Sequence, residues 1–370
     1  MLVKNAKVLT EDFVFDDLDV RTESGIICDI GKNLTSDDGE NVVDASGKYL
    51  LPGFIDVHTH GCMGYDTCDA DVDGYSVMSE FYASCGVTSF LFTTMTFSEK
   101  ILTSIIEKIN EFMAEKHEGA RPLGIYLEGP FINPNKKGAQ SEKYISDPDV
   151  DMFNRLQNLS DGKIKVVLVA PEMKNGLDFV KNVSGNVAVS IGHTGADYDT
   201  AVKAYENGAV DTTHLFNGMP SYHHRNPGVI GAAFEKCKFA ELICDGVHVH
   251  ENVIRNTFAS LGGDRVVLIS DSVRAAGMPD GDYTLGGQDI VLKSGKAFLP
   301  DGTIAGSAGN LGMCVKHCIN CGIKPEDAIK AATLNPARLI GLDDKIGSIA
   351  CGKFADLILV NEKFEFLKVL

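Results

Sequence analysis

The feature that most constrains the fold is an alternation, beginning at Leu51, of short apolar runs with amphipathic helical stretches. Apolar runs rich in β-branched residues are typical of strands buried on both faces of a parallel sheet. Helical periodicity lies between most of them, for example over Ser98–Lys116, Asp197–Asn207 and Asn252–Leu261. Eight such units predict an α/β protein, a (β/α)8 TIM-type barrel with insertions. The expected strands are Phe54–His60, Thr88–Thr94, Leu123–Glu128, Lys165–Ala170, Val187–Gly192, Ala209–His214, Ala240–Asp245 and Arg265–Asp271.

The two flanks of this pattern have a different character. Residues 1–50 and 348–370 contain short alternating stretches separated by Gly, Asn and Asp, which is typical of antiparallel strands. A small β-sandwich built from both termini would cover their unpaired edges. We therefore expect a barrel over 51–347, with a β-rich insertion near 282–307, between the two parts of a terminal β-domain.

Charge and hydropathy exclude several classes of function. The 34 basic and 51 acidic side chains give a net charge of −17, whereas a nucleic-acid-binding protein needs a basic footprint. No apolar run approaches the roughly 18 residues that cross a bilayer, and the first residues lack the apolar segment of a signal peptide. We expect a cytoplasmic protein with no membrane or nucleic-acid partner.

Ten cysteines in 370 residues are too sparse for a disulfide scaffold, so we expect reduced thiols. Cys318 and Cys321 form a C-x-x-C within a segment of helical pattern. Because no second pair accompanies it, the spacing is a weak signal for redox or zinc chemistry.

The string PGFIDVHTHG places two histidines at the end of the first barrel strand. His58 and His60 are two residues apart, so their side chains point to the same face of a strand. Asp56 has the same parity, and we expect its carboxylate to orient one of the imidazole rings.

Four more side chains occupy equivalent positions after other strands. In a (β/α)8 barrel, the carboxyl ends of all strands surround one pocket. Imidazole and carboxylate groups gathered there suit a divalent metal such as Zn²⁺ or Fe²⁺. These residues are Glu128, His193, His214 and Asp271.

At this point the chain resembles the amidohydrolase superfamily and, within it, the N-acetylglucosamine-6-phosphate deacetylases. The resemblance spans essentially the whole length and rests on PGFIDVHTHG, LEGPFINPNKKGA, SIGHT, THLFNGMP followed by RNPG, DGVHV and SDSVRAAG. Related cyclic-amide hydrolases usually bridge two metals with a carboxylated lysine on strand four. In this chain KIKVVLVAPE has lysines only at its start, and the resemblance implies that Glu128, on strand three, takes the bridging role.

The resemblance implies a role for each of these positions. Glu128, His193 and His214 match the principal metal ligands, and His58 and His60 match the pair that holds a second metal in some members. Asp271 matches the general base that takes a proton from the attacking water and returns it to the leaving nitrogen. His248, in DGVHV, matches the histidine that polarises the substrate carbonyl.

The resemblance also implies a phosphorylated amino sugar as substrate. Arg225, in the most basic loop of the chain, matches the phosphate-binding arginine, whose planar fork suits that anion. Gln140 departs from the pattern, because many members have histidine there. The family is commonly homodimeric. Other matched sugar-contacting positions are Ala139, Asn217, Gly218, Asp245, Gly246, Val247, His248, Ile304, Ala305 and Gly306.

Two alternatives follow from the same fold. A cyclic amide or ureide hydrolase would use the same barrel, but the missing lysine on strand four and the Arg225 loop argue against it. A non-catalytic binding protein would result if the metal ligands were lost, yet all five ligand positions and Asp271 are present. The sequence therefore favours hydrolysis of N-acetyl-D-glucosamine 6-phosphate to glucosamine 6-phosphate and acetate.

Overall fold

Strands occur at all eight of the predicted apolar runs in the computed structural model, which describes residues 1–370. Almost every residue of these strands is buried, as expected for a sheet covered on both faces. They are β6 (Phe54–Thr59), β9 (Val87–Thr93), β10 (Arg121–Leu127), β11 (Ile164–Val169), β12 (Ala188–Ile191), β13 (Asp211–Thr212), β14 (Ala240–Ile243) and β15 (Val266–Ile269).

These strands form a curled parallel sheet. Six of them pair in the order β13-β12-β11-β10-β9-β6, and β14 pairs with β15. The Leu215 N–H donates to the Glu241 carbonyl (2.8 Å), which links the chain after β13 to β14. The Asp271 N–H donates to the His58 carbonyl (3.0 Å), which links the end of β15 to β6. The β14–β15 pair therefore lies between the two edge strands of the six-stranded sheet.

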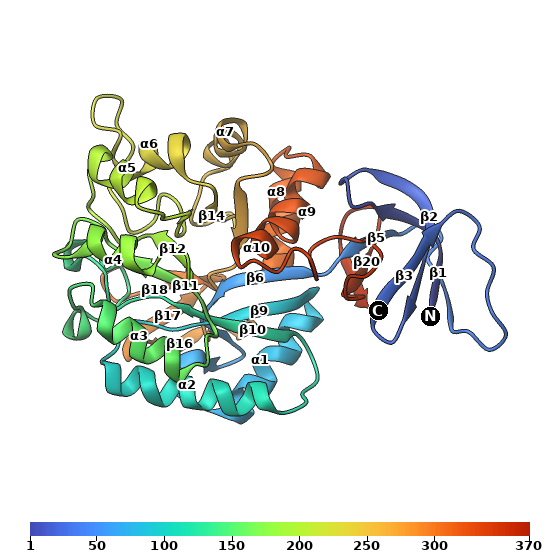
Figure 1. Ribbon diagram of the computed structural model, residues 1–370, viewed down its shortest axis with the longest axis horizontal. Coiled ribbons are helices and arrows are strands. Elements are labelled where there is room, and N and C mark those ends of the chain that lie inside the picture. Colours follow the sequence, from blue (N-terminus) through green and yellow to red (C-terminus); the bar gives the residue numbers. More distant parts are fainter.

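The helices surround the outside of this sheet (Figure 1). The three predicted from periodicity are present within two residues of their expected bounds. The Asp197 carboxylate accepts from the Thr200 N–H (2.8 Å) and so caps the start of α5. The α-helices are α1 (Val72–Ser84), α2 (Glu99–Ala114), α3 (Val150–Leu159), α4 (Gly176–Val183), α5 (Tyr198–Glu206), α6 (Gly228–Lys236), α7 (Glu251–Leu261), α8 (Leu311–Asn320), α9 (Pro325–Ala331) and α10 (Leu334–Leu339).

Both ends of the chain contribute strands to one mixed sheet of seven strands. Figure 1 shows it as blue and red strands beside the larger body. Strand β20 pairs antiparallel with β5, so segments from the two termini are neighbours. Ten buried side chains from both ends pack together as its core. The strands are β1 (Leu2–Leu9), β2 (Phe15–Glu23), β3 (Ile26–Gly31), β4 (Val42–Asp44), β5 (Tyr49–Pro52), β20 (Leu357–Val360) and β21 (Phe366–Val369).

The β-rich segment after β15 forms a four-stranded antiparallel sheet, in the order β16-β17-β18-β19. Its apolar side packs on Met95 and Val273, which brings β19 close to the strand ends of the larger sheet. The strands are β16 (Gly281–Leu285), β17 (Gln288–Lys293), β18 (Lys296–Phe298) and β19 (Ile304–Ser307); β7 (Gly61–Cys62), β8 (Tyr65–Asp66) and the 3₁₀ helices η1 (Thr67–Asp69), η2 (Pro134–Lys136) and η3 (Glu142–Tyr144) complete the structure.

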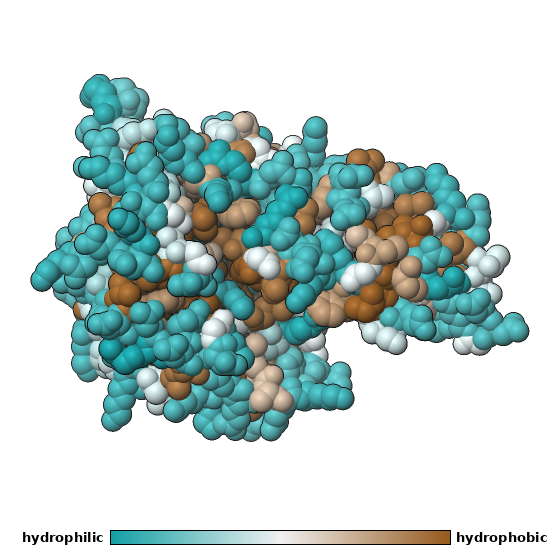
Figure 2. All heavy atoms as spheres, viewed as in Figure 1, coloured by the Kyte–Doolittle hydropathy of each residue, from teal (hydrophilic) through white to brown (hydrophobic).

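The surface agrees with the charged composition. Hydrophilic residues cover the outer edges of the face in Figure 2, and hydrophobic residues show mainly in its recesses and on the terminal sheet. None of the helices combines the length and apolar character that crossing a bilayer demands.

Candidate active site and metal centre

The six predicted donor side chains all lie at the carboxyl ends of strands. His58 is the penultimate residue of β6, and His60 directly follows that strand. Glu128 directly follows β10. His193, His214 and Asp271 each come two residues after β12, β13 and β15. These last three have positive φ angles of 43°, 28° and 48°. Positive φ is uncommon for non-glycine residues, although Asp and His adopt it more readily than most, and here it turns three donor side chains from the strand ends toward one another.

Glu128, His193 and His214 face one another in a first donor set. The Oε1 atom of Glu128 lies 3.2 Å from Nε2 of each of these two histidines, and the two Nε2 atoms are 3.2 Å apart. The other ring nitrogens point outward, with His193 Nδ1 2.7 Å from the Lys136 carbonyl and His214 Nδ1 3.2 Å from the Asn217 carbonyl. Backbone oxygens thus accept from Nδ1–H and leave both Nε2 atoms free for a cation.

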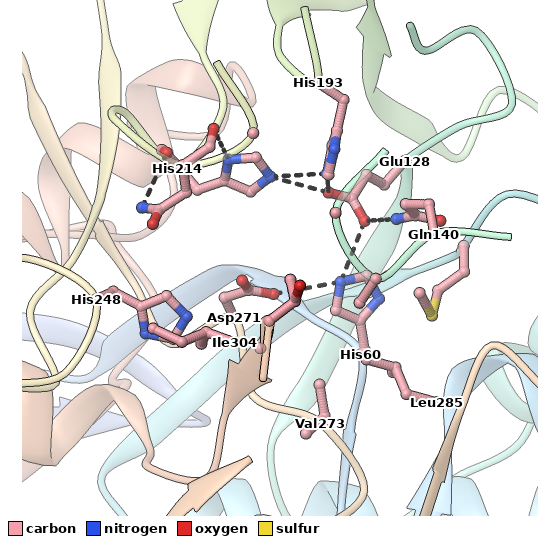
Figure 3. Close-up of a pocket in the computed structure, with 17 residues that line it drawn as sticks. His60, Glu128, Gln140, His193, His214, His248, Asp271, Val273, Leu285 and Ile304 are labelled. Atoms are coloured by element: carbon pink, nitrogen blue, oxygen red, sulfur yellow. Dashed lines mark hydrogen bonds and ion pairs between the residues drawn. The ribbon is translucent and has the colours of Figure 1, made fainter. Parts of the chain in front are cut away.

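His58, His60 and Asp271 form a second donor set beside the first. The Oδ1 atom of Asp271 lies 3.3 Å from His60 Nε2 and 3.7 Å from His58 Nε2. Glu128 belongs to this set too, because its Oε2 is 3.3 Å from His60 Nε2 and its Oε1 is 3.6 Å from His58 Nε2. Figure 3 shows Glu128 between His193 and His214 on one side and His60 on the other. One carboxylate therefore joins the two sets.

The residues of both sets suit a divalent cation. His58 Nε2 is buried, has no hydrogen-bond partner and points toward Glu128 and Asp271. Four imidazoles and two carboxylates buried together are the nitrogen and oxygen ligands that Zn²⁺ or Fe²⁺ prefers. Without a cation, burying such groups is costly unless they ionise against one another.

The electrostatics of the cluster follow from this mutual contact. Burial raises the pKa of Glu128, but hydrogen bonds from His193, His214 and His60 outweigh it and hold that pKa well below its ordinary value. Burial likewise opposes ionisation of Asp271, yet its contact with His60 keeps its pKa lowered. Burial lowers the pKa of His58. The carboxylates are therefore ionised at neutral pH and available as ligands or as proton acceptors.

The residue that orients His58 is Glu241, and the expectation for Asp56 was wrong. Glu241, in β14, is fully buried and its Oε2 lies 2.9 Å from His58 Nδ1 while accepting from the His214 N–H (3.1 Å). The Asp56 carboxylate instead accepts from the backbone N–H groups of His58 (3.4 Å) and Ser270 (3.3 Å), joining β6 to β15. A carboxylate hydrogen-bonded to a ligand histidine fixes the ring and its tautomer.

Gln140, whose contribution the sequence left open, contacts the centre directly. Its Nε2 donates to Glu128 Oε2 (2.5 Å), and its Oε1 accepts from the Thr96 N–H (2.7 Å). The side chain is buried, so the amide is held in one orientation. Gln140 thereby fixes the carboxylate that the two donor sets share.

His248 is held rigidly on the opposite wall (Figure 3). Its Nδ1 lies 2.8 Å from Asp245 Oδ2, and the backbone N–H groups of Val247 and His248 donate to the other oxygen. Burial lowers the pKa of His248, but the hydrogen bond to Asp245 prevails and raises it. The pKa of Asp245 falls to about 2, because His248 outweighs the opposing effect of burial. This pairing aims the remaining ring nitrogen, Nε2, away from Asp245.

All the donor side chains except the fully buried His58 line one cavity of about 240 Å³, together with His248. Most of the predicted sugar-contacting residues line it, and β16 and β19 supply part of the wall. Four of the predicted contacts, Asp245, Gly246, Val247 and Ala305, do not line it. Arg225 is on an exposed loop and does not line it either, and its Nη1 lies 2.8 Å from His224 Nε2. The predicted residues on the cavity wall are His60, Glu128, Ala139, His193, His214, Asn217, Gly218, His248, Asp271, Ile304 and Gly306.

Imidazole and carboxylate donors at the strand ends of a curled parallel sheet, around one cavity, define the chain as a metal-dependent hydrolase of the α/β class. A family model described as the amidohydrolase family matches residues 49–369, and the chain belongs to that family.

Several named relatives are similar over nearly the full chain. The N-acetylglucosamine-6-phosphate deacetylase of Lysinibacillus sphaericus is 36% identical, with 98% of this chain and 94% of the relative covered. An N-acetylgalactosamine-6-phosphate deacetylase of Escherichia coli O157:H7 is 33% identical, with coverage of 97% and 95%. Among solved structures, the N-acetylglucosamine-6-phosphate deacetylase of Pasteurella multocida has a TM-score of 0.93 at 28% identity, covering 100% of this chain and 97% of that one.

Proposed function

We propose that this protein hydrolyses N-acetyl-D-glucosamine 6-phosphate to D-glucosamine 6-phosphate and acetate. The observation that carries the proposal is the meeting of Glu128, His193 and His214 around one point of the cavity, with Asp271 and His248 on the same cavity. The substrate is inferred from the deacetylases that are similar over nearly the whole chain. The alternative of a cyclic-amide hydrolase has no comparable support.

The two donor sets would hold one or two divalent ions, Zn²⁺ or Fe²⁺. Glu128, His193 and His214 would bind the first, and His58, His60 and Glu128 the second. A divalent ion of this kind supplies Lewis acidity, which polarises a carbonyl and makes water a stronger acid. Glu241 and Gln140 would hold His58 and Glu128 in their ligand positions.

Asp271 is the residue we assign to proton transfer. Its pKa is lowered and its side chain lines the cavity, so it is ionised at neutral pH and able to accept a proton from the attacking water. The same carboxyl group then delivers the proton to the nitrogen as the amide C–N bond breaks, so the amine leaves neutral. Asp271 ends the cycle as a carboxylate, and the acetic acid that is formed loses its proton to solvent to give acetate.

His248 is assigned to the acetyl carbonyl. Because its Nδ1 is engaged by Asp245, its Nε2 is the atom available to the substrate. The raised pKa of His248 favours the form that donates from Nε2. A donor fixed before the reaction stabilises the negative charge that develops on the carbonyl oxygen, without reorganisation during the step.

We assign the phosphate to Arg225. None of the residues that line the cavity is a lysine or an arginine, so a cation for a dianionic phosphate has to come from outside the lining. The exposed loop with Arg225 follows His214, Asn217 and Gly218 in the sequence. In a homodimer, the Arg225 loop of one subunit would reach the cavity of the other. The remaining predicted contacts would bind the sugar hydroxyls.

We also propose how the two parts of the chain are built. Hydrogen bonds on both sides of the β14–β15 pair support a closed (β/α)8 barrel over 51–347, with the insertion near 282–307. The shared core of the terminal strands supports a small β-sandwich over 1–50 and 348–370. We also propose that the protein is cytoplasmic and homodimeric.

Metal quantification together with acetate release from the phosphorylated sugar tests the function. Metal-loaded protein should release acetate, and Asp271→Asn should lower kcat by about 10²–10⁴-fold, the contribution of a positioned acid–base. Asp12→Asn, at an exposed aspartate in the turn between β1 and β2, is the matched control and should retain full activity. Normal turnover in Asp271→Asn with metal still bound would remove that residue from the mechanism. Absence of acetate release by metal-loaded protein would refute the function, and turnover of a dihydropyrimidine would favour the alternative.

A further inference from the structure

A third group of potential ligands lies outside the cavity, at the junction of α7 and α8. Glu251 is the first residue of α7, His317 is in α8, and Cys321 caps the end of α8. One ligand atom from each of these three side chains lies within 4.8 Å of the other two. The two donor sets of the active site contain only nitrogen and oxygen ligand atoms, whereas this group also contains a sulfur atom.

Local helix geometry aligns two of the three donors. His317 and Cys321 are four residues apart, and the Cys321 N–H donates to the His317 carbonyl (2.9 Å), so both side chains are on the same face of α8. His and Cys are the usual ligands of zinc, and three intervening residues fall within the range of spacings between paired zinc ligands. Arg255 Nη1 donates to the Cys321 carbonyl (3.1 Å), which ties α7 to this end of α8 and brings Glu251 to the same place.

The imidazole of His317 has an unused ligand atom. Its Nε2 is buried and has no hydrogen-bond partner. Cys321 is a buried free thiol, 5% exposed, and the Glu251 carboxylate is largely exposed. The only ion pair of Glu251 is a distant one with Arg255 (3.8 Å), so a metal cation could replace Arg255 as the partner of this carboxylate. A thiolate, an imidazole and a carboxylate with one side open to solvent match a four-coordinate ion with a water as fourth ligand.

We propose that Glu251, His317 and Cys321 bind a divalent zinc-like cation at a site separate from the catalytic centre. Binding displaces the thiol proton of Cys321 to solvent and requires no change of oxidation state. The ion bridges the first turn of α7 and the end of α8. Neither Cys318 nor the C-x-x-C spacing takes part, because Cys318 is not among these donors.

The site adjoins the turn that carries His248. A Cβ atom at Gly246 would lie 3.1 Å from Cε1 of His317, so the ring packs directly on the Gly246 backbone. Gly246 has a φ of 77°, a conformation that favours glycine, and lies between Asp245 and His248. A cation that fixes the His317 ring therefore also supports the turn from behind.

Cobalt substitution distinguishes this site from the catalytic centre. Co²⁺ is the probe, added to metal-depleted full-length protein, because only a sulfur ligand gives an intense sulfur-to-cobalt charge-transfer band in the near ultraviolet. The wild type should develop that band and bind one cation more per chain than Cys321→Ser. Cys321→Ser should lose the band, while Cys351→Ser, at an exposed free thiol, and Cys318→Ala should keep it.

His317→Gln keeps the test decisive if Cys321→Ser fails to fold. In His317→Gln the band should weaken and require at least tenfold more Co²⁺. A wild type without the band, or a band that persists at full strength in Cys321→Ser, would overturn the proposal. Neither outcome bears on acetate release, so failure of this site is separable from failure of the deacetylase function.

Discussion

Replacing Glu241 tests how the second donor set is held in place. Glu241→Leu keeps the approximate volume but removes the carboxylate that lies 2.9 Å from His58 Nδ1 and accepts from the His214 N–H at 3.1 Å. Both groups are buried, so no water replaces the lost partner. His58 is then free to rotate or change tautomer, and the backbone at His214 loses an acceptor.

The expected magnitude follows from these two contacts. Loss of a carboxylate that orients a ligand histidine typically lowers metal affinity by about 10–100-fold, or roughly 1.4–2.7 kcal/mol. Leaving the His214 N–H unpaired costs a further ~1–3 kcal/mol of folding stability. Burial raises the pKa of Glu241 to about 8, so removing this carboxyl also relieves an unfavourable burial and partly offsets that loss. We therefore expect a larger effect on metal binding than on unfolding.

The assay is a metal titration of metal-depleted protein by calorimetry, with urea unfolding of the same samples. Glu241→Gln is the matched variant, because its amide oxygen can still accept from both groups, and it should retain most of the affinity. If Glu241→Leu binds metal within twofold of the wild type while unfolding normally, Glu241 does not position His58. If both variants lose affinity equally, the carboxyl group itself is required and an amide acceptor does not replace it.

Three further predictions concern the opposite wall and the basic loop. His248→Ala should lower kcat by about 10²–10³-fold with bound metal unchanged, measured as acetate release, and an unchanged kcat would remove its role at the carbonyl. Arg225→Ala should raise KM for the phosphorylated sugar far more than for the unphosphorylated one; equal losses on both would show that the loop does not bind phosphate. The pKa of Asp245 is lowered to about 2 in the folded protein, so the ionised carboxylate contributes about 2 kcal/mol to the free energy of unfolding. This contribution should be present above pH 4 and disappear as the pH falls through 2. Acid unfolding of Asp245→Asn should lack this part of the pH dependence, and identical pH profiles would contradict it.

The sequence was sufficient for the strand ends and for the types of donor on them. Apolar runs locate β6, β10 and β12 to within a few residues, and a His or Glu immediately after such a run is visible by eye. β13 is shorter than predicted, because the chain turns out of the sheet before His214, whose φ is 28°. Such a turn at a histidine has no sequence signature, since glycine is the residue that usually marks it.

The hydrogen bonds that hold the donor side chains in place could not be predicted, because they join residues far apart in the sequence. Strand parity favoured Asp56 as the partner of His58, but parity describes one strand and says nothing about its neighbours. Glu241 is 183 positions from His58, and only the three-dimensional arrangement of β6, β13 and β14 brings it there. The loop containing Gln140 likewise reaches Glu128 through a path that no periodicity describes.

The pairing of β5 with β20 has a consequence for biosynthesis. About 300 residues separate these strands, so at roughly 5–20 residues per second the ribosome needs about 15–60 s between them. During that interval the hydrogen-bonding groups along one side of β5 have no native neighbour in the nascent chain. This is the period in which a chaperone would have the most to protect, and in which a translational pause would matter most.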